Sequence, residues 1–310
     1  DESAPDSLGL GGATSLTSGA NSYFIDLLVS RSALAIENAY NQMRPATISY
    51  AQAAEPASLR QCWSSYPFID DQLMPVLQAR AGDSSVIATL ASVSQHTETL
   101  GFNGGSQLDP GAPMPTTLAQ EELWVSSDWP HWFRSALESQ YGGVAVQMAG
   151  SVGSVETPEV WSTMFARTPQ QFTNEGHPAG CRTLWPNPAG ATMTPLGYFS
   201  ETRALGQALA GAVEQALSSG ATVSHTNRMW AQTRDVCLPV DNVLFKAAAV
   251  GGVFAQRPAY LPGCKRVEKV PALPTGQTVG TSVKTEVAAW RIGDAEFIGL
   301  PGEVFPFTYF

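Results

Sequence analysis

The chain has 310 residues, and 44% of them are hydrophobic, which is enough for a packed core and excludes an intrinsically disordered protein. Its 17 basic and 27 acidic residues give a net charge of −10. This balance argues against nucleic acid as a partner, because phosphate binding needs a basic face, and against docking on an anionic membrane surface. The longest apolar run, 247–255, is too short to span a bilayer, so we expect a soluble globular protein.

Helix and strand signals are mixed in the first half of the chain, after a loop-rich entry over residues 1–20. Apolar residues at a spacing of three to four predict a helix that begins at Asn21–Ser22. It should end before Pro45, because proline cannot continue the helical hydrogen bonds. A strand is expected over 47–51. The run 86–93 is short, β-branched and uncharged, which is typical of a buried strand.

The second half shows the same mixture. Ser127 and Asp128, with Pro130 in the first turn, predict the start of a helix. The other expected elements are a buried strand over 144–149, a long loop over 161–194, a helix over 200–219, and two strands within 283–300 around a tight turn at Gly293–Asp294. Together they predict an α/β fold: a layered mixed β-sheet core with packed helices, in a single domain over 1–310.

The cysteines indicate the compartment. None lies within three residues of another, which excludes the usual zinc-finger and redox spacings. Two disulfides in an exported protein suit this spacing, and four buried thiols in a cytosolic enzyme are the alternative. Three pairings are possible, and we prefer the one that closes a short loop, Cys237–Cys264. The other two cysteines are Cys62 and Cys181.

Each of the four histidines can be weighed separately. His96 follows the strand predicted over 86–93, and the end of a core strand is where α/β sheets expose side chains to ligands. The alternative is a hydrogen-bonded structural histidine. His131 is expected to pack or to lie on the surface of a helix, and His177 and His225 are expected in exposed loops.

Several sequence blocks together resemble the neutral (non-lysosomal) ceramidase family. That family has a strand ending in a zinc-binding histidine, an S-D step that opens a helix, and a strand that runs into a Gly/Ser turn. It also has a P-G-E element whose glutamate binds the same zinc. The matching blocks of this chain, in order, are VIATLASVSQHTETLGFNGG, WVSSDWPHWFRSAL, GGVAVQMAGSVGSVETP and LPGEVFP.

The resemblance implies a zinc ion held by His96 and Glu303. A neutral imidazole nitrogen and a carboxylate oxygen are ligand types that suit this metal. Zinc polarises an amide carbonyl and lowers the pKa of water to about 7, so that hydrolysis needs no serine. Glu98 or Asp128 is then the candidate base, although Asp128 has the alternative role of a helix cap.

One catalytic position departs from the family pattern. The serine that resembles a nucleophile in the family aligns with Gly153, and Ser151 stands in place of the family's aspartate. Ser154, one residue away, is the candidate that would replace the serine. The alternative is that no serine acts.

The two ends also depart from the family pattern. The start, DESAPDSLGLGG, resembles the segment that follows the family's first zinc histidine, which would fall before Asp1, with Glu2 at the place of the second histidine. The family's metal-site tyrosine would fall beyond Phe310. We therefore expect a truncated or processed piece of a longer chain. It should bind zinc poorly alone, with an associated upstream peptide or self-assembly supplying what is missing.

Two functions from different classes follow. The first is a secreted zinc-dependent amide hydrolase of lipid metabolism, which resembles neutral ceramidase and acts on a small or lipid-like N-acyl or related amide. The second is a catalytically silent, hydrolase-derived structural protein of an extracellular assembly. The zinc content of the protein discriminates between them.

Overall fold

A computed structural model describes most of the predicted helices and strands. The described residues are 22–56, 61–62, 71–97, 127–153, 155–156, 198–240, 242, 260–261, 263–266 and 282–306. The chain divides into two compact units: one consists of Asp1–Arg44, Met229–Ile292 and Glu296–Pro301, and the other of Pro45–Arg228, Gly293–Ala295 and Gly302–Phe310. A single domain over the whole chain stays a prediction.

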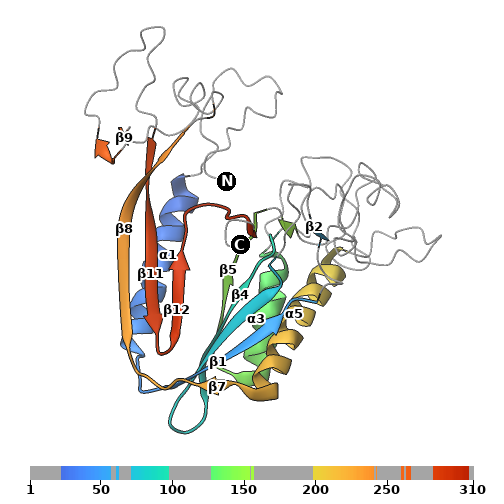
Figure 1. The fold of residues 1–310 in the computed structure, drawn as a ribbon. Coiled ribbons are helices and arrows are strands. Elements are labelled where there is room, and N and C mark those ends of the chain that lie inside the picture. The colour runs from blue at the N-terminus through green and yellow to red at the C-terminus, as the bar shows by residue number, and fades with distance from the viewer. Residues whose placement is uncertain are drawn as a thin grey trace, which may run out of the picture. The chain divides into compact units, whose positions relative to one another are not determined.

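A five-stranded mixed sheet forms the centre of the second unit (Figure 1). The strand order is β5-β4-β3-β1-β7, and only β4 and β5 are parallel among these neighbours. The bounds are β1 Thr47–Ala54, β3 Leu73–Arg80, β4 Val86–Val93, β5 Val144–Ala149 and β7 Thr222–Val223. A separate short pair, β2 (Gln61–Cys62) and β6 (Val155–Glu156), is antiparallel.

Two helices, α3 (Asp128–Tyr141) and α5 (Tyr198–Gly220), pack against each other and against one face of this sheet (Figure 1). Gly206 permits their close approach, because a Cβ atom there would lie 2.6 Å from the Trp129 carbonyl oxygen and 2.7 Å from the Phe133 nitrogen. The predicted layered mixed sheet with packed helices is confirmed. The buried core consists chiefly of Met74, Val76, Ala91, Val93, Trp129, Phe133, Leu137, Leu205, Leu209 and Val213.

The first unit contains helix α1 (Ser22–Asn41) and an antiparallel sheet. In this sheet β11 pairs with β8 along its whole length, and β12 and β9 are its other neighbours. Trp290 of β11 and Phe297 of β12 stack with their ring centroids 5.4 Å apart. The bounds are β8 Met229–Pro239, β9 Tyr260–Leu261, β10 Lys265–Arg266, β11 Ser282–Ile292 and β12 Ala295–Gly299.

A disulfide joins Cys237 of β8 to Cys264, which precedes β10. This is the preferred pairing from the sequence, and it is confirmed. Cys62 lies in β2, and Cys181 lies outside the described residues.

Most predicted elements agree with the structure to within a few residues, and the strand expected over 47–51 continues to Ala54. The predictions for residues 1–20 and for a loop over 161–194 lie outside the described residues. Strands β3 and β8 were not predicted, and neither were the two-residue strands β2, β6, β7, β9 and β10. Within the described parts of the chain, no helix is long and apolar enough to cross a membrane.

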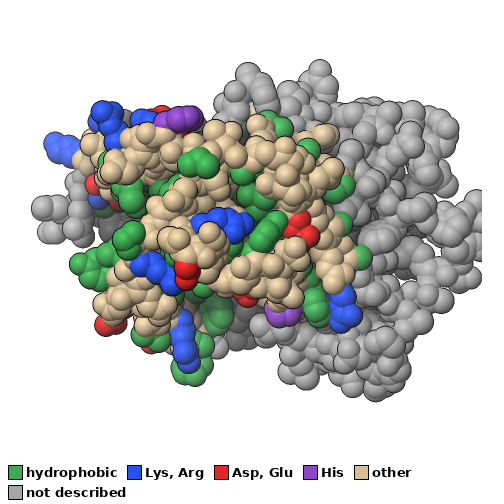
Figure 2. Space-filling view, turned by 90° about the horizontal axis from the view of Figure 1, so that it is seen from below, with side chains coloured by type: hydrophobic (Ala, Val, Ile, Leu, Met, Phe, Trp, Pro, Cys, Tyr) green, Lys and Arg blue, Asp and Glu red, His purple; other side chains and the backbone are tan. Residues whose placement is uncertain are grey.

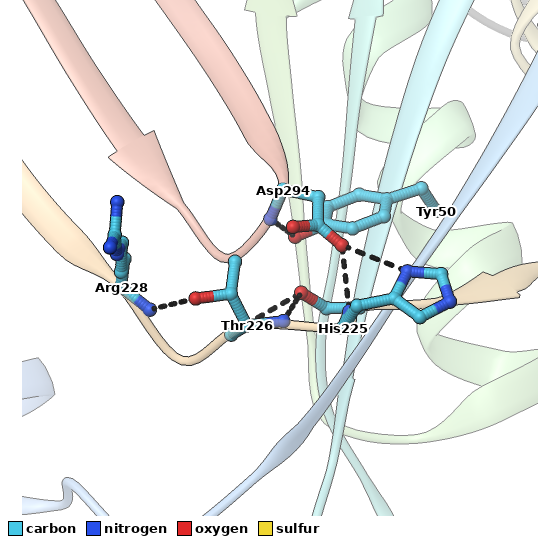
Figure 3. A network of polar contacts seen from close by, with 6 residues as sticks. Tyr50, His225, Thr226, Arg228 and Asp294 are labelled. Atoms are coloured by element: carbon cyan, nitrogen blue, oxygen red, sulfur yellow. Dashed lines mark hydrogen bonds and ion pairs between the residues drawn. The ribbon is translucent and has the colours of Figure 1, made fainter.

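A polar network around Asp294 lies at one end of the second unit's sheet (Figure 3). At this end Ser224, which follows β7, donates its N–H to the Ile48 carbonyl at 2.8 Å. The Asp294 carboxylate accepts a 2.7 Å hydrogen bond from the His225 N–H, and it lies 3.3 Å from the His225 ring nitrogen. The Asp294 N–H in turn donates to the Tyr50 hydroxyl at 2.9 Å. These bonds attach the 293–295 turn to β1 and to the segment after β7.

Charged side chains of both signs are interspersed on the face of the molecule shown in Figure 2. Lys and Arg side chains do not gather into one patch among the described residues of that face.

The Asp294 network predicts a pH-dependent contribution to stability. The hydrogen bond from the His225 N–H lowers the pKa of the Asp294 carboxyl below its ordinary value of 3.8. A lowered pKa in the folded state stabilises the protein above the unfolded-state value, and the contribution is lost as the pH falls through the folded-state pKa. We expect Asp294→Asn to lower the urea midpoint at pH 7, and this difference should shrink as the pH falls through 3.8 and below.

The control is Glu296→Gln, which removes a surface ion pair with Arg291 of 3.1 Å. Such exposed pairs contribute little. A midpoint difference between wild type and Asp294→Asn that is the same at every pH would contradict the assignment.

Candidate metal centre

His96 lies just beyond β4, at the edge of the sheet where the parallel strands β4 and β5 both end. The turn after β5 is attached there, because Gly150 donates its N–H to the Val93 carbonyl at 2.9 Å. Glu303 reaches the same place from the far end of the sequence. The distance between His96 Nε2 and Glu303 Oε1 is 3.3 Å. The resemblance predicted this proximity, and the proximity is confirmed.

The geometry of the pair fits two ligands of one zinc ion. Ligands bonded at about 2.0–2.1 Å to tetrahedral zinc lie about 3.3–3.4 Å from each other. The observed 3.3 Å between His96 Nε2 and Glu303 Oε1 agrees with this value. The same separation suits a direct ion pair or hydrogen bond when no metal is bound. The His96 side chain is 14% exposed and that of Glu303 is 66% exposed, so that the pair is open to solvent on the glutamate side.

Further ligands are not assembled in the described part of the chain, where no group of three or more His, Cys, Asp or Glu residues is placed to hold a metal. His131 lies exposed on α3, with its ring edge to face against Trp132. His225 lies beside Asp294, at the end of β1 opposite to the His96 edge. His177 lies outside the described residues.

Of the three predicted catalytic residues, the structure describes only Asp128. Glu98 and Ser154 lie outside the described residues, and their roles stay predictions. Asp128 is the first residue of α3 and is 5% exposed. Its Oδ1 accepts the Trp129 N–H at 2.7 Å, and its φ of 53° is in the left-handed region. These contacts support a structural role at the start of the helix, and a role as base stays a prediction.

Trp129 connects this helix start to the candidate metal centre. Its indole Nε1–H donates to the His96 carbonyl oxygen at 2.7 Å. The ring itself is fully buried in the core, so its position is set by packing. The carbonyl of the candidate ligand is therefore hydrogen-bonded to a side chain that is buried in the core.

A buried polar cluster that sequence reasoning missed surrounds the end of β4. Glu55 accepts hydrogen bonds from the Ser94 N–H and the Gln95 side-chain amide, each at 2.8 Å. Ser94 Oγ accepts the Ser151 N–H at 3.2 Å, and Ser151 Oγ donates to Asp71 at 3.2 Å. The available signal was a glutamate placed directly after an apolar strand, in AQAAEP, where a charge is costly unless it is hydrogen-bonded.

Gly153 has no room for a side chain. A Cβ atom there would lie 2.8 Å from Phe305 Cδ2 and 3.0 Å from the Phe305 nitrogen. The backbone is also attached, because the Gly153 N–H donates to the Val304 carbonyl at 3.1 Å. Gly153 aligns with the family's serine in the resemblance, and Phe305 occupies the space that a serine side chain would need.

Comparison with known proteins gives likeness of fold. No family model matches the chain, and no curated protein matches it. A solved structure titled "Ceramidase complexed with C2" has a TM-score of 0.50 and 12% sequence identity, over 86% of this chain and 43% of that one. The neutral ceramidase from Pseudomonas aeruginosa has a TM-score of 0.48 and 14% identity, over 86% of this chain and 42% of that one. The chain thus spans less than half the length of these ceramidases, and it has a ceramidase-like fold.

The contact between Gly153 and Phe305 predicts the effect of a single methyl group. Gly153→Ala should destabilise the protein by about 1–3 kcal/mol, because the added atom forces apart two backbone segments that are hydrogen-bonded. Gly211→Ala is the matched control. It lies within α5 with no atom within 4 Å of the place that the new methyl group would take, and it should be neutral or stabilising by up to about 1 kcal/mol.

Urea denaturation of both variants provides the measurement. The double variant Gly153→Ala/Phe305→Ala should lose less stability than the sum of the two single variants, because removal of the ring makes room for the methyl group. Equal stability of Gly153→Ala and Gly211→Ala would show that the turn is not packed as described.

Proposed function

We propose that this protein is a ceramidase-like zinc-dependent amide hydrolase, in which His96 and Glu303 hold the metal. The observation that carries the proposal is the 3.3 Å separation of His96 Nε2 and Glu303 Oε1, two groups of suitable chemistry brought together from distant parts of the sequence. The ceramidase-like fold supports it.

The residues of the chain have distinct parts in this proposal. His96 presents Nε2 from a backbone whose carbonyl is held by Trp129. The exposed side of Glu303 leaves access for a substrate. Zinc, when bound, supplies Lewis-acid polarisation of a carbonyl and lowers the pKa of water. Glu98, two residues after His96, is the proposed base, since Asp128 is occupied in the start of α3.

The substrate class is an N-acyl or related amide, small or lipid-like. The similar solved structures bear the name ceramidase, and this is the reason to begin with N-acylated lipids. Because Phe305 fills the space beside Gly153, the proposal requires hydrolysis without a serine at that position, and Ser154 is the proposed substitute if a serine acts. Secretion is proposed from the Cys237–Cys264 disulfide, since such bonds persist in oxidising compartments.

Zinc titration tests the metal centre. We expect His96→Ala and Glu303→Gln each to weaken zinc binding at least about tenfold, because each removes a ligand. His131→Ala and Glu296→Gln are the matched controls, an exposed histidine and an exposed glutamate outside the pair, and they should leave the affinity unchanged. Affinity is measured by competition with a fluorescent chelator.

The same experiment separates the two functional classes. A zinc-dependent amide hydrolase should hydrolyse N-acylated lipids when zinc is bound and lose this activity when zinc is removed by a chelator. Equal zinc affinity in all four variants would show that His96 and Glu303 do not bind the metal. Zinc binding without hydrolysis of any N-acyl amide would favour the catalytically silent structural protein.

A further inference from the structure

We propose that Glu55 is a positioning residue for His96, an inference that rests on the proposed function. Glu55 lies outside the candidate ligand pair and directly follows β1, whereas His96 follows β4. Its carboxylate is hydrogen-bonded to the two residues that immediately precede His96.

The backbone of Glu55 is itself fixed. The residue follows directly after β1, and its N–H donates to the Gln72 carbonyl at 2.8 Å, which continues the pairing of β1 with β3 by one step. The side chain is 2% exposed. A carboxylate held in this way is a rigid acceptor at the edge of the sheet where β4 ends.

Each oxygen of this carboxylate accepts a hydrogen bond from a different residue. Oε1 accepts the Ser94 backbone N–H and Oε2 accepts the Gln95 side-chain amide, each at 2.8 Å. Ser94 is the first residue beyond β4 and is 1% exposed, so its N–H must find a partner within the protein. Hydrogen bonds to an ionised acceptor are stronger than neutral ones. Glu55 therefore sets the direction in which the chain leaves the strand.

Two other contacts complete the support of this segment. Ser94 Oγ lies 3.3 Å from Ser151 Oγ and accepts the Ser151 N–H, which connects the segment to the turn after β5. The Trp129 indole N–H is hydrogen-bonded to the carbonyl of His96 itself. Hydrogen bonds thus hold residues 94 and 95 and the carbonyl of His96. Because this backbone is held, the His96 imidazole is pre-organised toward Glu303. Residues that are hydrogen-bonded to a ligand itself typically affect metal affinity 10–100-fold, and we expect the lower end of this range for Glu55, which contacts the two residues before His96.

A buried polar residue can also act only through global stability, and Gln78 provides the matched comparison. Gln78 is 1% exposed, and its Nε2 donates to Thr89 Oγ1 at 3.0 Å between β3 and β4 of the same sheet. Its loss removes a buried hydrogen bond without touching residues 94–96. A role of Glu55 in stability alone would make Glu55→Ala and Gln78→Ala equivalent.

The experiment compares zinc affinity, hydrogen exchange of the Ser94 amide and urea stability in Glu55→Ala, Glu55→Gln and Gln78→Ala. We expect Glu55→Ala to weaken zinc binding by about tenfold and to speed Ser94 exchange at least about tenfold relative to Gln78→Ala. Gln78→Ala should change zinc affinity by less than about threefold despite its loss of stability. Glu55→Gln should restore most of the affinity, because an amide oxygen still accepts the Ser94 N–H once Gln95 turns its own amide.

Equal zinc affinity and equal Ser94 exchange in Glu55→Ala and Gln78→Ala would overturn the inference. If Glu55→Ala does not fold, Glu55→Asp takes its place, since it keeps the charge and shortens the reach, and the same direction is expected. If His96→Ala binds zinc as tightly as the wild-type protein does, this result overturns the proposed function instead. Ser94 exchange, which needs no metal, then decides the positioning of His96 by itself.

Discussion

The parallel pairing of β4 with β5 determines where the candidate metal centre lies. The register runs from Ala88↔Val144 to Val93↔Ala149, so both strands end at the same edge of the sheet. Parallel neighbours need a crossover connection, and α3 supplies it over the covered face of the sheet. His96 and the turn at 150–153 consequently emerge together, and the segment that carries Glu303 attaches to this turn through Gly153 and Val304.

Core packing and the geometry of the centre depend on the same side chain. Trp129 is fully buried, and its ring meets that of Phe133 edge to face with the centroids 6.1 Å apart. The one polar atom of this ring is hydrogen-bonded to the carbonyl of His96. A buried indole N–H needs a partner, and here the partner is the backbone of the candidate ligand. The packing of α3 on the sheet thus fixes one side of the site.

The sequence predicted the parts of the fold that have a clear local signal. Helices α3 and α5 have apolar spacing and end signals, β4 is a continuous uncharged run, and the turn at Gly293–Asp294 joins two strands. Strand β3 was missed because Pro75 interrupts it, and β8 was missed because much of its polar sequence is exposed and lacks alternation. The His96–Glu303 pair came from a resemblance of motifs. The position of Glu55 directly after an apolar strand signalled a hydrogen-bonded glutamate, but its partners could not be predicted, because they lie 39 and 40 positions away and only tertiary structure brings them together.

X-ray absorption at the zinc edge tests the central claim, that His96 and Glu303 bind zinc through one nitrogen and one oxygen. With zinc bound to the 310-residue chain alone, the account predicts nitrogen and oxygen ligands at about 2.0–2.2 Å, with imidazole scattering that is lost in His96→Ala. Sulfur ligands at about 2.3 Å, or imidazole scattering that persists in His96→Ala, would contradict it.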